Sequence, residues 1–158
     1  MDVLQKLLAI EEIKQLKARY FRGMDTKDAA LLASCFAPDA SADFRGATTD
    51  PRTGINATPS STGEVLQGGE AIVATITGAL AKLQTVHHGC CPEIEITGED
   101  TANGIWAMVD YLRMPPDSRV AEMDGWGHYI ESYRRIEGKW KIQTIRLPRL
   151  RVDVRTRS

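Results

Sequence analysis

The spacing of apolar residues changes once along this chain, and that change limits the folds open to it. Up to Gln84 the longer apolar segments repeat every three or four positions, which is typical of helices that bury one face. Beyond Gln84 the chain is rich in β-branched and aromatic residues divided by turn-forming residues, which predicts strands. Because strands that follow one another without helices pair antiparallel, the pattern predicts an α+β fold.

The predicted elements are three helices and six strands. The helices cover about Val3 to Arg22, Lys27 to Phe36 and Glu70 to Leu83. Two short strands are expected at Ala40 to Phe44 and Glu64 to Gln67, and four long ones at Val86 to Thr97, Ala102 to Met114, Trp126 to Ile136 and Trp140 to Val152. Gly23 is expected to end the first helix with a positive φ, and Thr26 to cap the second. The four long strands should form a meander around the first helix.

A polar stretch from Ser41 to Thr62 interrupts the apolar pattern. It consists largely of Ser, Thr, Gly, Asp and Pro, so it has turn residues throughout and little to bury. Long loops in compact domains are either mobile or functional. Residues 45–63 therefore form either a lid over a pocket or a disordered insertion, and the sequence leaves both open.

Charge and cysteine content narrow the classes of partner and compartment. With 20 Lys and Arg against 21 Asp and Glu, the chain has no overall attraction for nucleic acid or an acidic membrane. Three cysteines cannot all pair within the chain, which favours reduced thiols and a cytoplasmic protein. The charged N-terminal segment reads as neither a signal peptide nor a membrane span. We expect one domain over residues 1–158, since this length builds a single core.

Two histidines, His87 and His88, begin the first long strand. Neighbours on a strand point to opposite faces, so only one of them can face the interior. His88 shares its phase with Ile94 and Ile96, but a bulge at Gly89 or Pro92 would reset the face, so either histidine remains a candidate. The same geometry argues against a metal site in the segment HHGCC. Its two cysteines are expected to be small buried residues rather than nucleophiles.

Asp110 shares an apolar face with Trp106, Met108 and Leu112. A buried carboxylate without a partner costs several kcal/mol, so Asp110 needs an internal partner or a pocket. Arg149 and Arg146 on the last predicted strand are candidates for that partner. A structural ion pair and a functional role are both open.

The order of the elements, together with the segments ARYFRGMD, VHHGCCPEIEI, TANGIWAMVDYL and EGKWKI, resembles the SnoaL-like branch of the nuclear-transport-factor-2-like (NTF2-like) superfamily. The chain is similar in particular to bile-acid 7α-dehydratase, and more distantly to lindane dehydrochlorinase and scytalone dehydratase. The resemblance implies a cone-shaped α+β barrel, in which three N-terminal helices pack in a strongly curved, mostly antiparallel sheet around an apolar cavity. It also implies a homo-oligomer, with a trimer favoured over a dimer.

Five positions match the dehydratase pattern: Tyr20, Asp25, His87, Asp110 and Arg149. The resemblance implies that Asp25 and His87 form a dyad in which the imidazole is a general base, a role that suits its titration near neutral pH. Tyr20 would stabilise a developing oxyanion or protonate departing hydroxide. Asp110 and Arg149 would position the substrate or assist the leaving group. No cofactor and no metal are implied.

We therefore predict a cofactor-independent lyase, in the first place a dehydratase. Its partner would be a hydrophobic polycyclic or aromatic substrate, steroid-like or polyketide-like. An isomerase or a polyketide cyclase could use the same pocket, and a non-catalytic small-molecule-binding or association module is a second alternative. A structural interpretation remains, in which Asp25 caps the second helix and His87 is a core histidine. Candidate pocket residues are Phe44, Ile105, Trp106, Met108, Met123 and Trp126.

Overall fold

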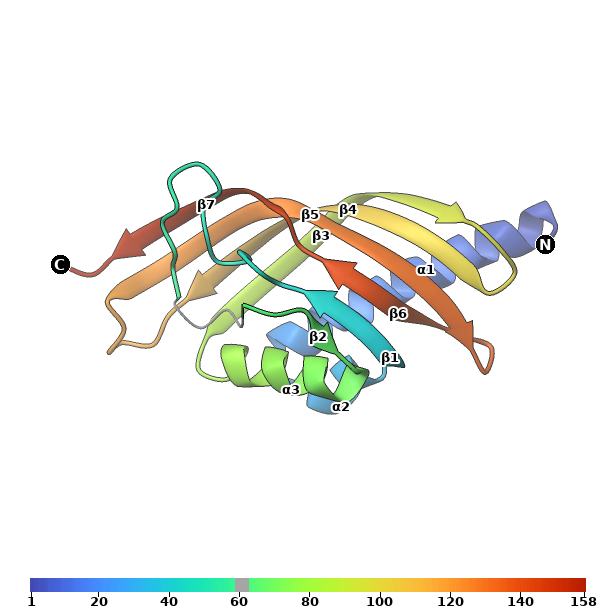
Figure 1. Ribbon diagram of the computed structural model, residues 1–158, viewed down its shortest axis with the longest axis horizontal. Coiled ribbons are helices and arrows are strands. Elements are labelled where there is room, and N and C mark those ends of the chain that lie inside the picture. The colour runs from blue at the N-terminus through green and yellow to red at the C-terminus, as the bar shows by residue number, and fades with distance from the viewer. Residues whose placement is uncertain (59–62) are drawn as a thin grey trace.

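A computed structural model describes residues 1–58 and 63–158 of the protein and confirms the α+β class (Figure 1). Within these residues three helices and seven strands follow one another. They are α1 (Val3–Asp25), α2 (Ala29–Ala33), β1 (Phe36–Asp43), β2 (Leu66–Gln67), α3 (Gly69–Leu80), β3 (Gln84–Ile96), β4 (Thr101–Arg113), β5 (Val120–Ile136), β6 (Lys139–Arg146) and β7 (Arg149–Thr156). Among the described residues, no helix has both the length and the apolar character that crossing a bilayer requires.

The connection between α1 and α2 differs from the prediction. Gly23 does not end α1, which continues to Asp25, and Thr26 is its C-cap. The residue with a positive φ is Lys27, at 60°. Gly23 lies inside α1 because α2 packs closely there, and a Cβ at Gly23 would lie 3.1 Å from the Leu32 nitrogen. The prediction that Thr26 caps the second helix is therefore wrong.

The shortened α2 is capped by Asp28, whose carboxylate accepts a hydrogen bond from the Leu31 backbone nitrogen. Phe36, predicted to be the last residue of this helix, instead begins β1.

The sheet has the order β2-β1-β6-β5-β4-β3, and β7 also pairs with β5. Strands β3 to β6 form the predicted antiparallel meander, whereas β1 runs parallel to β6, so the sheet is mixed but mostly antiparallel. The predicted last strand is in fact two strands, β6 and β7, which pair with opposite halves of the 17-residue β5. The break falls at Leu147 and Pro148, because proline has no N–H and the Leu147 nitrogen bonds to Asp43 of β1 instead.

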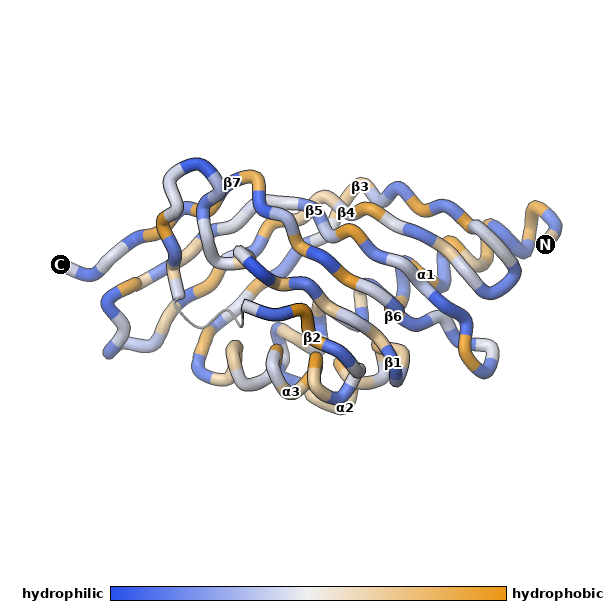
Figure 2. The backbone as a smooth tube through the Cα atoms, in the orientation of Figure 1, coloured by the Kyte–Doolittle hydropathy of each residue, from blue (hydrophilic) through white to orange (hydrophobic). Residues whose placement is uncertain are grey.

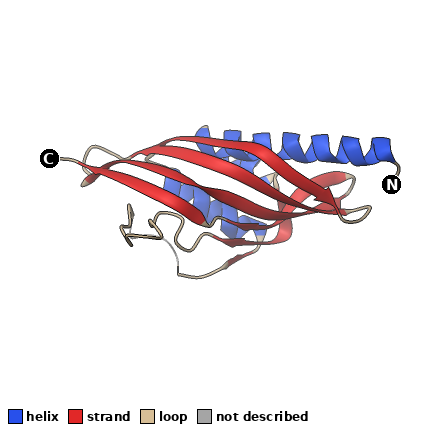
Figure 3. Cartoon of the chain, turned by 90° about the horizontal axis from the view of Figure 1, so that it is seen from above, coloured by secondary structure: helices blue, strands red, loops and turns tan. Residues whose placement is uncertain are grey.

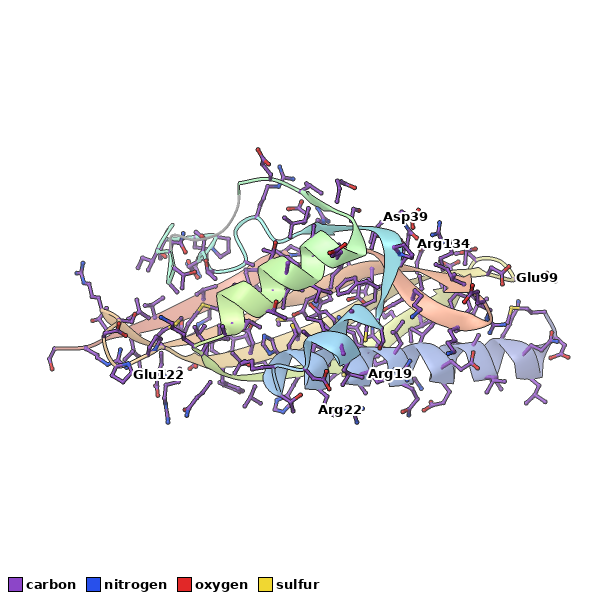
Figure 4. The ribbon with its side chains drawn as sticks, turned by 90° about the horizontal axis from the view of Figure 1, so that it is seen from below. Arg19, Arg22, Asp39, Glu99, Glu122 and Arg134 are labelled. Carbon is purple, nitrogen blue, oxygen red and sulfur yellow. The ribbon has the colours of Figure 1, made fainter. Side chains whose placement is uncertain are left out.

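The helices lie on one side of the sheet, as the views from above and below make clear (Figures 3 and 4). Side chains along β4 and β5 alternate between this covered side and the opposite one. Figure 2 shows hydrophobic and hydrophilic residues interspersed along these strands, and the covered side also carries buried charges, Asp110 and Glu131. The core packs apolar residues of α1, α3 and the sheet together, including Leu16, Ile72 and Ile142. The strong curvature expected of the sheet stays a prediction.

The described part of the predicted 45–63 loop is held against β7. Thr49 and Asn56 form an isolated bridge, and the buried Asp50 accepts hydrogen bonds from the Val152 and Thr53 backbone nitrogens, both within 2.9 Å. These bonds, that from Val152 foremost, lower the pKa of Asp50 to about 2. Residues 59–62 of the predicted lid or insertion lie outside the described residues, so that choice stays open.

Candidate active site

A bulge in β3 decides which histidine faces the helices. One extra residue is inserted between Cys90 and Glu93, so the strand changes phase there. His87 is consequently buried, on the same side as Ile94, and His88 is exposed on the outer face. This confirms the prediction that a bulge changes the face to which the side chains of this strand point. Cys90 and its neighbour Cys91 are exposed, so the prediction that they are buried is wrong.

Asp25, the last residue of α1, holds both the ring and the backbone of His87. Its Oδ1 lies 2.6 Å from Nδ1 of His87, and its Oδ2 accepts a hydrogen bond from the His87 backbone nitrogen at 2.9 Å. The Thr85 hydroxyl donates to Oδ1, also at 2.9 Å. Asp25 does not cap α2, whose N-cap is Asp28, so the prediction of a capping role for Asp25 is wrong.

These bonds determine the ionisation of Asp25. Burial alone would raise the pKa of this carboxyl, but the hydrogen bonds from the ring and backbone of His87, and then from Thr85, together lower it. An ionised carboxylate can only accept, so Nδ1 of His87 carries a proton. In the neutral ring Nε2 is then left with its lone pair. The dyad thus presents a basic nitrogen away from Asp25.

Asp110 and Arg149 form a buried ion pair beside this dyad. Nη2 of Arg149 lies 2.7 Å from Oδ2 of Asp110, Nη1 lies 3.1 Å from Oδ1, and both side chains are 3% exposed. Arg149 is therefore the partner of Asp110, whereas Arg146, the other candidate, is exposed. Asp110 is directly opposite His87 in the β3–β4 register, but its Oδ2 is 3.9 Å from Nε2 of His87, too far for a hydrogen bond.

Gly125 of β5 leaves the space that this ion pair occupies. A Cβ at Gly125 would lie 2.4 Å from Oδ1 of Asp110 and 2.5 Å from Nη1 of Arg149. We expect Gly125→Ala to lower the free energy of unfolding by about 1–3 kcal/mol, because the buried pair must shift. Urea unfolding measures this loss. Without the clash, alanine in a strand would be at least as stable as glycine.

A matched control for that variant is Gly78→Ala in α3. A Cβ at Gly78 meets nothing within 4 Å, so this change should leave stability equal or slightly raised. If Gly125→Ala were as stable as the control, the close packing around Asp110 would be wrong.

Two buried tyrosines, Tyr20 from α1 and Tyr129 from β5, lie edge to face with ring centroids 5.9 Å apart. Burial, followed by the neighbouring Tyr129, raises the pKa of Tyr20 well above its usual range, and burial likewise raises the pKa of Tyr129. Both phenols therefore keep their protons and can donate. Sequence reasoning missed Tyr129, although it shares the inward phase of Met123 along β5.

These groups surround a cavity of about 150 Å³. Four of the five predicted site residues line it, and Asp25 lies behind His87. Of the six apolar residues proposed for the pocket, only Phe44 and Met123 line it. Trp106 and Met108 belong to the core, and Ile105 and Trp126 lie in the opposite phase of their strands. Most of the remaining wall is apolar and includes Met24, Ile76, Leu80, Leu112 and Leu147.

A second buried charge pair, Lys17 and Glu131, lies next to the two tyrosines. Lys17 donates to Glu131, and both side chains are at most 1% exposed. The Lys17 ammonium is 3.6 Å from the centre of the Tyr129 ring. Burial lowers the pKa of Lys17 to about 8, although Glu131 opposes this. Sequence reasoning missed Lys17, although its position four residues after the buried Ile13 places it on the buried face of the helix.

Comparison with known proteins identifies the family. Residues 5–146 match the SnoaL-like domain. The chain belongs to the SnoaL-like family. Solved structures similar to this SnoaL-like protein include hexachlorocyclohexane dehydrochlorinase LinA type 2, with 20% identity over 98% of this chain and 94% of that chain and a TM-score of 0.76. A candidate scytalone dehydratase from Novosphingobium aromaticivorans DSM 12444 has 17% identity over 99% and 94% of the two chains and a TM-score of 0.78.

A third similar structure is that of a single-residue variant of Rv3472, a protein of unknown function from Mycobacterium tuberculosis. It has 24% identity over 90% of this chain and 77% of that chain, with a TM-score of 0.71. At these identities the likeness establishes the fold, and it confirms the predicted NTF2-like α+β architecture. The finer resemblance to bile-acid 7α-dehydratase stays a prediction.

Proposed function

We propose that this SnoaL-like protein is a cofactor-independent lyase, in the first place a dehydratase, whose base is His87. One observation carries the proposal: a buried imidazole bonded through Nδ1 to Asp25 at 2.6 Å lines an apolar cavity. Asp25 fixes the ring tautomer and stabilises the imidazolium that forms on proton uptake. A purely binding pocket has no need of such a charged dyad behind its wall.

The reaction follows from where the polar groups lie. Nε2 of His87 takes a proton from a carbon next to a carbonyl, and the C–H electron pair moves into an enolate. Tyr20 or Tyr129 donates a hydrogen bond to the oxyanion, since both are neutral donors on the cavity wall. The enolate then expels hydroxide, which leaves as water after taking a proton from the His87 imidazolium. The base is thereby restored.

Arg149 is suited to hold the leaving oxygen. Four of its five N–H groups have acceptors among the described residues: the Ala47 carbonyl, the Met108 sulfur and the two Asp110 oxygens. Arg149 lines the cavity, and its remaining N–H, on Nη2, is available to donate to a hydroxyl of the substrate. Asp110 keeps the guanidinium in this orientation.

The proposed substrate is a hydrophobic small molecule with a polycyclic or aromatic framework, steroid-like or polyketide-like. The cavity volume of about 150 Å³ is comparable with that of cavities that take a molecule of the size of benzene. The ring that carries the carbonyl would therefore fill the cavity, with any further rings extending beyond it. A homo-oligomer, with a trimer favoured over a dimer, a cytoplasmic location and a single domain over residues 1–158 stay predictions.

Proton abstraction is tested separately from loss of the leaving group. Cyclic β-hydroxyketones and β,γ-unsaturated ketones are incubated with the protein in D₂O and followed by NMR. We expect deuterium at the carbon next to the carbonyl and formation of the enone from the β-hydroxyketones. Migration of the double bond without any elimination would favour the isomerase alternative, and ring closure of linear polyketide analogues would favour the cyclase. Binding without exchange would leave only the binding or association module.

A further inference from the structure

We propose that Lys27 and Thr85 are positioning residues that hold Asp25 ionised and oriented, so that His87 presents a neutral Nε2 to the cavity. This inference rests on the proposed function, because it gives these two residues a role in keeping His87 competent as the general base. Neither residue lines the cavity. Lys27 lies in the turn after α1, and Thr85 lies in β3, two positions before His87.

The turn after α1 directs Lys27 back onto the site. Its backbone has a φ of 60°, which is uncommon for a residue other than glycine and is often found at functional sites. From this turn its Nζ donates to the Met24 carbonyl at 3.1 Å and to Oγ1 of Thr85 at 2.7 Å. The first bond satisfies a carbonyl at the end of α1, which is an ordinary helix-capping role. The second has no such role in the helix.

The bond from Lys27 determines where the Thr85 hydroxyl points. An ammonium group can only donate, so it occupies a lone pair of Oγ1, and the single hydroxyl proton is left for another acceptor. That acceptor is Oδ1 of Asp25, 2.9 Å away. Asp25 then receives hydrogen bonds from Thr85, from the His87 ring and from the His87 backbone. A carboxylate with this many donors stays ionised, and the proton stays on Nδ1 of His87.

Lys27 also completes the balance of charge around His87. Among the described residues, the charged groups next to the His87 ring are Asp25 from α1 and Asp110 from β4, and Arg149 from β7 pairs with Asp110. On their own these groups carry an excess of one negative charge, which would favour the imidazolium form that cannot act as a base. Lys27 supplies the second positive charge, and the nearby Tyr20 and Tyr129 are neutral.

The inference is tested with two pairs of variants. Thr85→Val removes the hydroxyl while keeping the shape, and Thr85→Ser restores it. Lys27→Met removes the charge while keeping an unbranched side chain, and Lys27→Arg restores it. The first measurement is the pKa of Asp25, followed by ¹³C NMR of the carboxyl carbon and assigned with Asp25→Asn. We expect Thr85→Val to raise this pKa and Thr85→Ser to leave it near that of the unmodified protein.

The second measurement is the pH profile of kcat/KM. We expect Lys27→Met and Thr85→Val to move the acidic limb upward by about half to one pH unit, which is a roughly threefold to tenfold loss below the limb and little loss above it. Lys27→Arg should keep the original limb. Folded variants that leave both the Asp25 pKa and the limb unchanged would overturn the inference and leave helix capping as the role of Lys27. Because the NMR measurement needs no substrate, failure of the proposed reaction is distinguishable from failure of this inference.

Discussion

Replacing His87 by glutamine is expected to lower turnover by roughly 10² to 10⁴-fold while leaving the protein folded. General base catalysis contributes a factor of this size, and an amide cannot accept a proton near neutral pH. Glutamine is chosen because it can still donate a hydrogen bond toward Asp25, which limits disturbance of the buried site. The measurement is the rate of enone formation from a substrate found among the cyclic β-hydroxyketones. The variant should also lose the acidic limb of the pH profile.

The neighbouring histidine provides the control. His88 has the same chemistry and precedes the same bulge, but it points to the outer face of the sheet, where its ring lies 6.5 Å from that of Tyr111. His88→Gln should therefore keep turnover within about twofold of the unmodified protein, as expected of a group outside the site. Near-normal turnover by His87→Gln, or an equal loss in both variants, would remove the dyad as the source of activity.

Lys17→Met is expected to lower the free energy of unfolding by about 3–5 kcal/mol. The change leaves the Glu131 carboxylate buried without its counter-charge, and a lone buried charge costs about that much. Glu131 keeps one partner, because the Tyr133 hydroxyl donates to it and in turn accepts from Nε1 of Trp106 at 2.8 Å. One neutral donor does not replace an ammonium group. Urea unfolding at fixed protein concentration measures the loss.

Two further variants make this result specific. Lys14→Met removes a lysine from the exposed face of α1, where its pair with Glu11 spans 3.6 Å and the side chains are 45% and 56% exposed. An exposed pair of this kind contributes at most about 1 kcal/mol, so little stability should be lost. Combining Lys17→Met with Glu131→Gln should recover much of the loss, because no buried charge remains. A loss from Lys17→Met no larger than that from Lys14→Met would contradict this view of the pair.

Local patterns predicted most of the fold and part of the site. The phase of Asp110 along its strand correctly indicated a buried acid in need of a partner. That phase could not choose between Arg149 and Arg146, because the answer depends on the break at Pro148, which turns the last predicted strand into two. Similarly, the sequence identified the two histidines but not the exact place of the extra residue that turns His87 inward.

The errors arise where tertiary packing overrides local preference. Glycine is the residue expected just past the end of a helix, but Gly23 lies inside α1, where its lack of a side chain lets α2 approach closely. The left-handed backbone conformation is adopted by Lys27 instead. Tyr129, Thr85 and Lys17 were not singled out because each is ordinary in its own segment. Their importance comes from contacts with residues far along the chain, such as the 60 positions that separate Thr85 from Asp25.

The bulge in β3 restricts how many residues can separate His87 from the apolar end of the strand. His87 and Ile94 are an odd number of positions apart, so a regular strand would turn one of them outward, and the additional residue between Cys90 and Glu93 compensates for the difference. A single deletion between them would therefore turn either the His87 imidazole or the apolar side chains at the end of β3 toward the outer face. Loss or gain of residues in pairs would preserve both, and the length of this short segment is constrained in parity more than in composition.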